Sequence, residues 1–238
     1  MPRKLLVCLI CFTAGFMMSR MFASGIVAAE ETNSIRFLVV DQNNQPVENA
    51  VVELVSSDHS HPALEPARMD QINKSFAPHV LTITKGQSVS FPNSDQIRHH
   101  VYSFSPPKPF EIRLYAGTPG DPVPFDKTGV VVLGCNIHDH MVGYIYIGET
   151  GYTGISDQNG ETDIQAPMEF DSVRLWHEQL SLDGQTRLLL KKSQLKTETS
   201  KDGQSIYRLQ LPVVIKTPAQ KTENSKDVRN KFMKFGSP

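Results

Sequence analysis

Residues 130–147 read Val130-Val131-Val132-Leu133-Gly134-Cys135-Asn136-Ile137-His138-Asp139-His140-Met141-Val142-Gly143-Tyr144-Ile145-Tyr146-Ile147. A β-branched apolar run leads into this stretch, and an apolar run with two tyrosines leads out of it. The turn between them carries Cys135, His138, His140 and Met141. The stretch therefore predicts two β-strands joined by a turn that is rich in sulfur and nitrogen donors.

The donor types in this turn indicate which metal it would hold. A thiolate, an imidazole and a thioether within seven residues form a soft donor set. Such a set suits copper, for which two His and one Cys in a plane with a weak axial Met make an electron-transfer site. Zinc usually takes four strong ligands, and a Met contributes little to it. The turn therefore favours copper.

A second imidazole for such a plane is expected from elsewhere in the chain. His99 and His100 lie 36 and 35 residues before Cys135 and follow a predicted strand pair, residues 80–84 and 88–91. Adjacent residues of an extended chain point to opposite faces, so at most one of the two histidines faces a given site. We expect that residue to be His99.

These motifs resemble those of cupredoxins. The spacing of Cys135, His138 and Met141, with two residues between successive ligands, is similar to the short ligand loop of the amicyanin type. Residues 69–150 resemble more closely the plastocyanin-like proteins labelled as methylamine utilization proteins. The segments that carry this likeness are Phe91-Pro92-Asn93, His99-His100-Val101-Tyr102-Ser103 and Gly134-Cys135-Asn136-Ile137-His138.

The resemblance implies an eight-stranded Greek-key β-sandwich that holds one copper ion. Its metal ligands would be His99, Cys135 and His138 in the plane, with Met141 as the axial ligand. Two departures leave the class of site open. His100 stands where blue copper proteins often have Asn, whose hydrogen bonds help to fix the ligand loops, and His140 adds an imidazole one residue from Met141.

The other histidines leave alternatives open. His100 is expected beside the ligands or at the surface, and His140 on the solvent side of the turn, although either could replace a ligand. His59 and His61 could capture a second metal ion, and a solvated loop is the alternative interpretation.

The flanks of this region predict a second β-sandwich. Residues 35–54 and 153–164 each indicate a hairpin, and further strands are expected at 173–176, 186–191 and 206–215. The first segment resembles the opening of the carboxypeptidase regulatory-like, transthyretin-like β-sandwich. Ser156-Asp157 with Gly160 resembles what normally follows that opening directly, but here roughly a hundred residues intervene.

We therefore expect a cupredoxin domain, residues 65–150, inserted in a discontinuous sandwich of residues 30–64 and 151–216. A lone hairpin at 35–54 would have little stability of its own, and insertion at a surface loop is tolerated. The alternative is two consecutive domains, in which the first hairpin extends the cupredoxin. The polar, Lys-rich residues 217–238 predict a disordered tail.

The N-terminus predicts a secretory signal peptide, residues 1–29. A basic start, Arg3-Lys4, precedes an uncharged apolar run at 5–18 and a stretch of small residues. The run is short for a bilayer span, although a retained anchor is the alternative. Cleavage would leave Cys135 as the only thiol, no membrane anchor, and a periplasmic or secreted protein.

Composition narrows the class of protein further. The chain has 24 Lys plus Arg against 25 Asp plus Glu, so no excess of positive charge favours nucleic acid as a partner. Fifteen Gly and 16 Pro among 238 residues indicate many turns and favour an all-β fold. We find no motif for a catalytic triad, a phosphate loop or paired carboxylates, so we do not expect an enzyme.

Three functions fit this sequence. The first is a periplasmic type 1 (blue) copper protein that carries electrons between redox partners such as a c-type cytochrome or a periplasmic dehydrogenase. The second is a periplasmic module that binds or delivers copper without an electron-transfer role. The third is an interaction module that does not use the metal. The likeness to the methylamine family does not itself imply that methylamine is involved, because function depends on the site and its partner.

Overall fold

The computed structural model describes residues 33–56, 65–166, 170–200 and 202–216. The expected signal peptide, His59, His61 and the expected tail 217–238 lie outside these residues. Within the described ranges, no helix is long and apolar enough to cross a membrane. The helix found there is one 3-10 turn, η1 (Lys192–Gln194), and the other regular elements are β-strands, as the all-β prediction requires.

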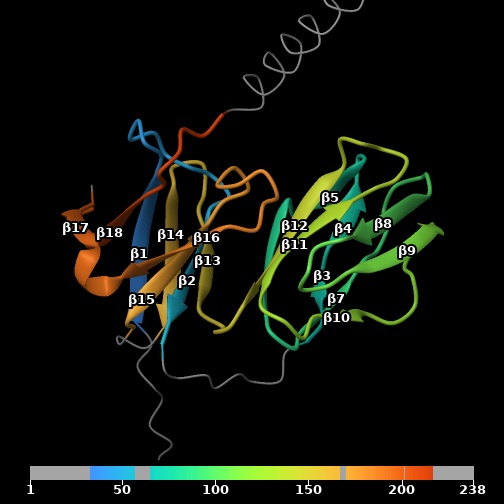
Figure 1. Cartoon of the computed structure of the whole chain (residues 1–238), viewed down its shortest axis with the longest axis horizontal. Helices are drawn as coiled ribbons and strands as arrows, with labels where there is room; N and C mark the ends of the chain where they lie inside the picture. The colour runs from blue at the N-terminus through green and yellow to red at the C-terminus, as the bar shows by residue number, and fades with distance from the viewer. Residues whose placement is uncertain (1–32, 57–64, 167–169, 201, 217–238) are drawn as a thin grey trace, which may run out of the picture. The chain divides into compact units, whose positions relative to one another are not determined.

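Ten strands lie between residues 65 and 150. They are β3 (Ala67–Arg68), β4 (Asp70–Ile72), β5 (Ser75–Ala77), β6 (Val80–Thr84), β7 (Ser88–Ser90), β8 (His99–Ser103), β9 (Phe110–Tyr115), β10 (Val123–Pro124), β11 (Gly129–Gly134) and β12 (Val142–Gly148). One sheet has the order β6-β12-β11-β8-β9, a second has the order β10-β7-β3, and β4 pairs with β5 (Figure 1). Side chains of both larger sheets meet in one buried cluster, which includes Val89, Val101 and Val131. The region is thus a β-sandwich with ten strands, two of them only two residues long, where the resemblance implied eight.

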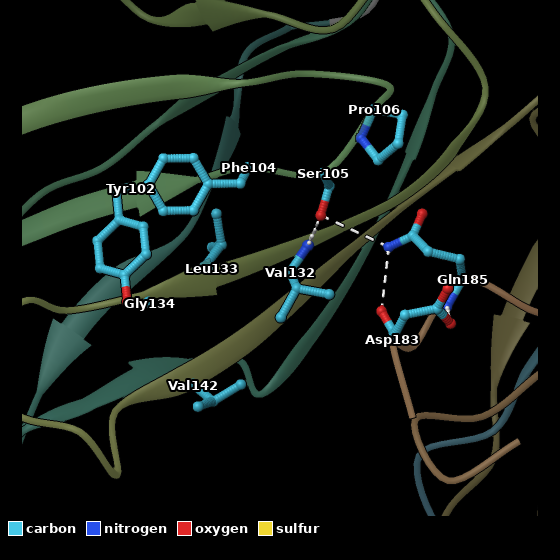
Figure 2. Close-up of a pocket in the computed structure, with 10 residues that line it drawn as sticks. All are labelled: Tyr102, Phe104, Ser105, Pro106, Val132, Leu133, Gly134, Val142, Asp183 and Gln185. Carbon is cyan, nitrogen blue, oxygen red and sulfur yellow. Dashed lines mark hydrogen bonds between the residues drawn. The ribbon is translucent and has the colours of Figure 1, made fainter. Parts of the chain in front are cut away.

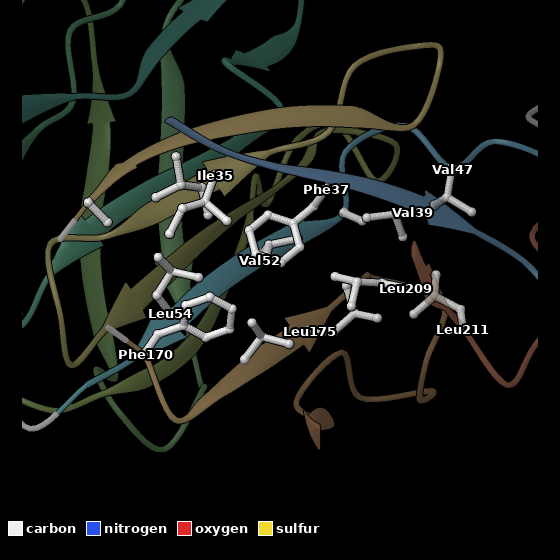
Figure 3. Close-up of a cluster of buried hydrophobic side chains, with 14 residues drawn as sticks. Ile35, Phe37, Val39, Val47, Val52, Leu54, Phe170, Leu175, Leu209 and Leu211 are labelled. Carbon is white, nitrogen blue, oxygen red and sulfur yellow. The ribbon is translucent and has the colours of Figure 1, made fainter. Parts of the chain in front are cut away.

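Eight further strands form two more sheets. They are β1 (Asn33–Val40), β2 (Val51–Val55), β13 (Thr153–Ile155), β14 (Glu161–Ala166), β15 (Ser172–Trp176), β16 (Arg187–Lys191), β17 (Lys196–Thr199) and β18 (Ser205–Gln210). Their orders are β14-β1-β18-β17 and β13-β2-β15-β16. Apolar side chains of the two sheets share a second buried cluster, in which Phe37, Val52 and Leu175 lie together (Figure 3). Strands β1 and β2 therefore pair with strands that follow the central region, not with strands inside it.

Three segments that the sequence suggested as hairpins are not hairpins. Strands form at the expected places, but β1 and β2 belong to different sheets, and so do β6 and β7, and β13 and β14. The turn between β6 and β7 shows how this happens: Gly86 has a φ of 89° and donates its N–H to the carbonyl of Phe125. The turn thus leads the chain from one sheet to the other. Strand patterns locate each strand, whereas the partner depends on contacts distant in sequence.

Strand β12 shows why the apolar run after the ligand turn is almost continuous. Ile145 and Ile147 pack in the same cluster as the β8 and β11 side chains. Tyr144 and Tyr146 on the other face pack against Trp176 of β15. Because successive side chains of a strand point to opposite faces, β12 needs apolar residues at nearly every position.

Candidate metal centre

Three of the expected ligands converge on one point of the β-sandwich. Cys135 directly follows β11, His138 lies in the next turn, and His99 is the first residue of β8. The Sγ atom of Cys135 lies 3.9 Å from Nδ1 of His99 and 3.8 Å from Nδ1 of His138. One donor atom from each residue lies within 4.8 Å of the other two.

The fourth expected ligand, Met141, joins them through the shape of the turn. The N–H of His138 donates to the carbonyl of Cys135 at 3.4 Å, and the N–H of Met141 donates to the carbonyl of His138 at 2.9 Å. Two successive four-residue turns, each closed by an i+3 to i hydrogen bond, thus bring every third side chain to the same side. Met141 is 1% exposed and packs in the same cluster as Cys135, which is 2% exposed.

His99, Cys135, His138 and Met141 are clustered like a type 1 copper site. The donor set fits copper because it combines a thiol, two imidazoles that turn the same nitrogen toward the sulfur, and a thioether. Within the described residues, no second group of His, Cys, Asp or Glu comes together in this way.

The buried imidazole of His99 is held from its far side by Asp95. The Nε2 atom of His99 lies 2.7 Å from Oδ2 of Asp95, and the side chains are 0% and 13% exposed. Desolvation acts to raise the pKa of Asp95, but hydrogen bonds from the Lys74 amide, His99 and the Asn73 amide outweigh it and lower the pKa below its usual value. The carboxylate is therefore ionised at neutral pH. Sequence reasoning missed Asp95, because nothing in the spacing of Asp95 and His99 marks a contact in an extended chain.

His138 differs from the other ligands because its side chain is partly exposed. Its ring centroid lies 5.1 Å from that of His99 and 6.0 Å from that of His140. The pKa of His138 is lowered by desolvation first and then by electrostatic interactions with His99, Lys74 and His140, although Asp95 acts in the opposite direction. A neutral imidazole is the form that can bind a metal.

The two histidines that could have replaced a ligand lie elsewhere. His100 is not part of the donor cluster around Cys135, and its Nε2 lies 2.9 Å from Oε1 of Glu111 on β9. Within the part of the chain that the structure describes, its Nδ1 atom is buried and has no hydrogen-bond partner. His140 is exposed on the solvent side of the turn.

A shallow cavity of about 410 Å³ lies over the strand that leads to Cys135 (Figure 2). Tyr102 covers Gly134 there so closely that a Cβ atom on residue 134 would lie 2.7 Å from the ring. The adjoining Phe104 is 85% exposed. At the other side of the cavity, Gln185 donates to Asp183 and to Ser105. The cavity is also lined by Gly134 and Val142, the chain neighbours of Cys135 and Met141.

No family model and no curated protein matches the sequence. Several solved structures are similar to part of the structure. A purple cupredoxin from Nitrosopumilus maritimus is 21% identical, matches 34% of this chain and 99% of its own, and gives a TM-score of 0.31. A substituted amicyanin is 12% identical over 42% of this chain and 100% of its own, with a TM-score of 0.32. A copper-containing nitrite reductase from Thermus scotoductus is 24% identical over 46% of this chain but only 28% of its own, with a TM-score of 0.34. These scores are low, so we base the site on its own side chains.

Proposed function

We propose that this protein is a cupredoxin-type electron carrier whose copper is held by His99, Cys135, His138 and Met141. The observation that carries the proposal is the convergence of one cysteine sulfur with the Nδ1 atoms of two histidines, from segments 36 residues apart, beside a buried methionine. When bound, copper supplies a one-electron couple between Cu(II) and Cu(I).

The burial of the donors favours a carrier over an enzyme. His99, Cys135 and Met141 are each at most 2% exposed, so they leave no side on which a substrate could approach them. The partly exposed imidazole of His138 is the donor that reaches the surface. We propose that electrons pass through its edge to a redox protein partner, such as a c-type cytochrome or a dehydrogenase.

We further propose that the protein is exported and that its flanking strands form a second sandwich. The charged start and apolar run of residues 1–18 support export to the periplasm or the exterior. The pairing of β1 with β14 and of β2 with β15 supports a flanking sandwich that is split by the copper-binding region. We relate residues 69–150 to the methylamine-labelled plastocyanin-like proteins on their motifs alone.

Repeated reduction and oxidation of the copper-loaded protein tests the electron-carrier function. A carrier keeps its ion in both states, so a Cu(I) chelator should remove little copper after reduction, and the original absorption spectrum should return on reoxidation. Complete loss of copper to the chelator after one reduction would contradict the proposal.

Copper delivery is the second candidate. The observation that favours it is the exposed His140, whose ring centroid lies 6.0 Å from that of His138 and could accept the ion as it leaves. In that case His140→Ala should slow the transfer of copper to a chelator. For an electron carrier, the same variant should leave retention unchanged.

A further inference from the structure

The two ring nitrogens of His99 face different partners. Nδ1 lies 3.9 Å from Sγ of Cys135, and Nε2 lies 2.7 Å from Oδ2 of Asp95. A neutral imidazole carries one proton, and only the nitrogen without it has a lone pair for a metal. The position of this proton therefore decides whether His99 can act as a ligand through Nδ1.

The carboxylate of Asp95 is already surrounded by donors. Its Oδ1 accepts the backbone N–H of Asn73 at 2.7 Å, and its Oδ2 accepts the backbone N–H of Lys74 at 2.9 Å. Backbone N–H groups can only donate, so both oxygens of Asp95 must act as acceptors. Because these hydrogen bonds also lower the pKa of Asp95, its carboxylate has no proton to donate, and the hydrogen bond to His99 takes the proton from Nε2 of the imidazole.

These two donors are fixed by the backbone of the β4–β5 hairpin. Asn73 and Lys74 form its turn and have φ angles of 55° and 58°, as a tight hairpin turn with two left-handed residues requires. The turn directs both of its N–H groups to the same carboxylate. The N–H of Asp95 itself donates to Oδ1 of Asn93 at 3.0 Å. The carboxylate is thus held in place from two directions.

We propose that Asp95 is a positioning residue that keeps the proton of His99 on Nε2 and leaves Nδ1 free as a metal ligand. The inference rests on the proposed copper site, and it names a group outside the four ligands on which that site depends. Groups that hold a ligand histidine in this way typically change metal affinity by 10- to 100-fold.

Asp95→Asn tests the proposal, because it replaces one acceptor oxygen by an amide donor among three other donors. If the amide nitrogen turns toward His99, it favours the imidazole with its proton on Nδ1. If it turns toward the hairpin, the turn loses a hydrogen bond. We expect a 10- to 100-fold weaker copper affinity and loss of the Nε2–H form of His99 in the ¹⁵N NMR spectrum of the metal-free protein.

Glu111→Gln is the matched control. It alters the same kind of histidine–carboxylate pair one residue along β8, where His100 and Glu111 lie 2.9 Å apart and His100 is not part of the donor cluster. This variant should leave both the copper affinity and the proton position of His99 unchanged.

Two results would overturn the proposal. One is an Asp95→Asn protein with unchanged copper affinity and His99 still protonated at Nε2. The other needs no variant, and so stands even if Asp95→Asn fails to fold: a metal-free wild-type protein in which neutral His99 carries its proton on Nδ1. A wild-type protein that binds no copper, yet has its His99 proton on Nε2, would defeat the proposed function and leave the role of Asp95 intact.

Discussion

The four donor side chains are not equivalent, because they differ in strength and in exposure. Cys135 and the two histidines would be strong donors to copper, whereas the thioether of Met141 would be a weak one. His138 is partly exposed, and Met141 is buried. The two residues should therefore affect the site in different ways.

We expect His99→Ala and His138→Ala each to remove the intense absorption that arises from thiolate-to-copper charge transfer. Met141→Leu should keep the colour and change the reduction potential, because a weakly bound thioether would tune the potential of the site more than it would hold the ion. Visible spectroscopy and voltammetry check this. Retained colour in His99→Ala with loss of colour in His100→Ala would show that the wrong histidine was chosen.

At the residue scale, donor chemistry and local spacing predicted which side chains come together. The motif at 135–141 gives three of the clustered donors, and His99 rather than His100 joins them. Asp95 and Glu111 could not be found in this way. Their partners are set by how β4, β5 and β9 approach β8, and this approach depends on packing that no local pattern encodes.

At the scale of elements, the ligand turn depends on close contact between β12 and β5. Gly143 lies two residues after Met141, and a Cβ atom there would lie 2.7 Å from Cβ of the buried Phe76. We expect Gly143→Ala to lower the free energy of unfolding by about 1–3 kcal/mol, because a packed core resists added volume. Chemical denaturation measures this.

Gly120→Ala is the control for this substitution. A Cβ atom on residue 120 would have no other heavy atom within 4 Å, and Gly120 does not have a positive φ. Its effect should stay within about 0.5 kcal/mol. Equal destabilisation by the two substitutions would mean that the contact with Phe76 is not the cause.

Glu53 of β2 links the two groups of sheets. Its side chain is 0% exposed, and it accepts hydrogen bonds from the hydroxyl of Tyr146 at 2.7 Å and from the N–H of Glu149 at 2.6 Å. Arg174 contributes a further contact at 3.3 Å. A buried carboxylate with this many donors joins β2 and β15 to the end of β12.

We expect Glu53→Ala to cost about 3 kcal/mol of unfolding free energy, because it leaves buried donors without acceptors. Glu198→Ala, which breaks the exposed ion pair with Arg208, should cost at most about 1 kcal/mol. Thermal or chemical denaturation compares the two. Similar losses in both variants would refute a special role for Glu53.

Strand positions follow from local sequence patterns, but strand partners do not. Apolar patterns placed most strands correctly, for example at residues 173–176, which lie within β15, and at residues 186–191, which overlap β16. They gave the wrong partners for β1, β6 and β13, because a turn between two strands is compatible with either one sheet or two. Whether two consecutive strands share a sheet depends on how their side chains pack in the buried clusters around Phe37 and Val101.

At the scale of the whole molecule, the positions of β1 and β2 make the split arrangement testable. β1 lies between β14 and β18, and β2 lies between β13 and β15. A fragment of residues 151–238 would lack both central strands, so it should not fold. A fragment of residues 65–150 holds all four donors and its own sheets, so it should fold and bind copper.

The second fragment should melt at a lower temperature than the full chain, because Val80, Val130 and Tyr146 would lose their contact with Trp176. Joining residues 30–64 to 151–216 by a short Gly/Ser linker should restore a cooperative transition to the flanking part. Melting curves of the three fragments distinguish a split sandwich from two domains in series. A stable 151–238 fragment would favour two domains in series.

The visible absorption spectrum of the Cu(II)-loaded protein, recorded beside that of Cys135→Ala, tests the copper site most directly. We expect the wild-type chain to bind one copper ion and to show an intense thiolate-to-copper charge-transfer band, and the alanine variant to lose both. A wild-type spectrum without this band at full copper loading, or an alanine variant with unchanged copper affinity, would contradict the assignment of Cys135 as a ligand.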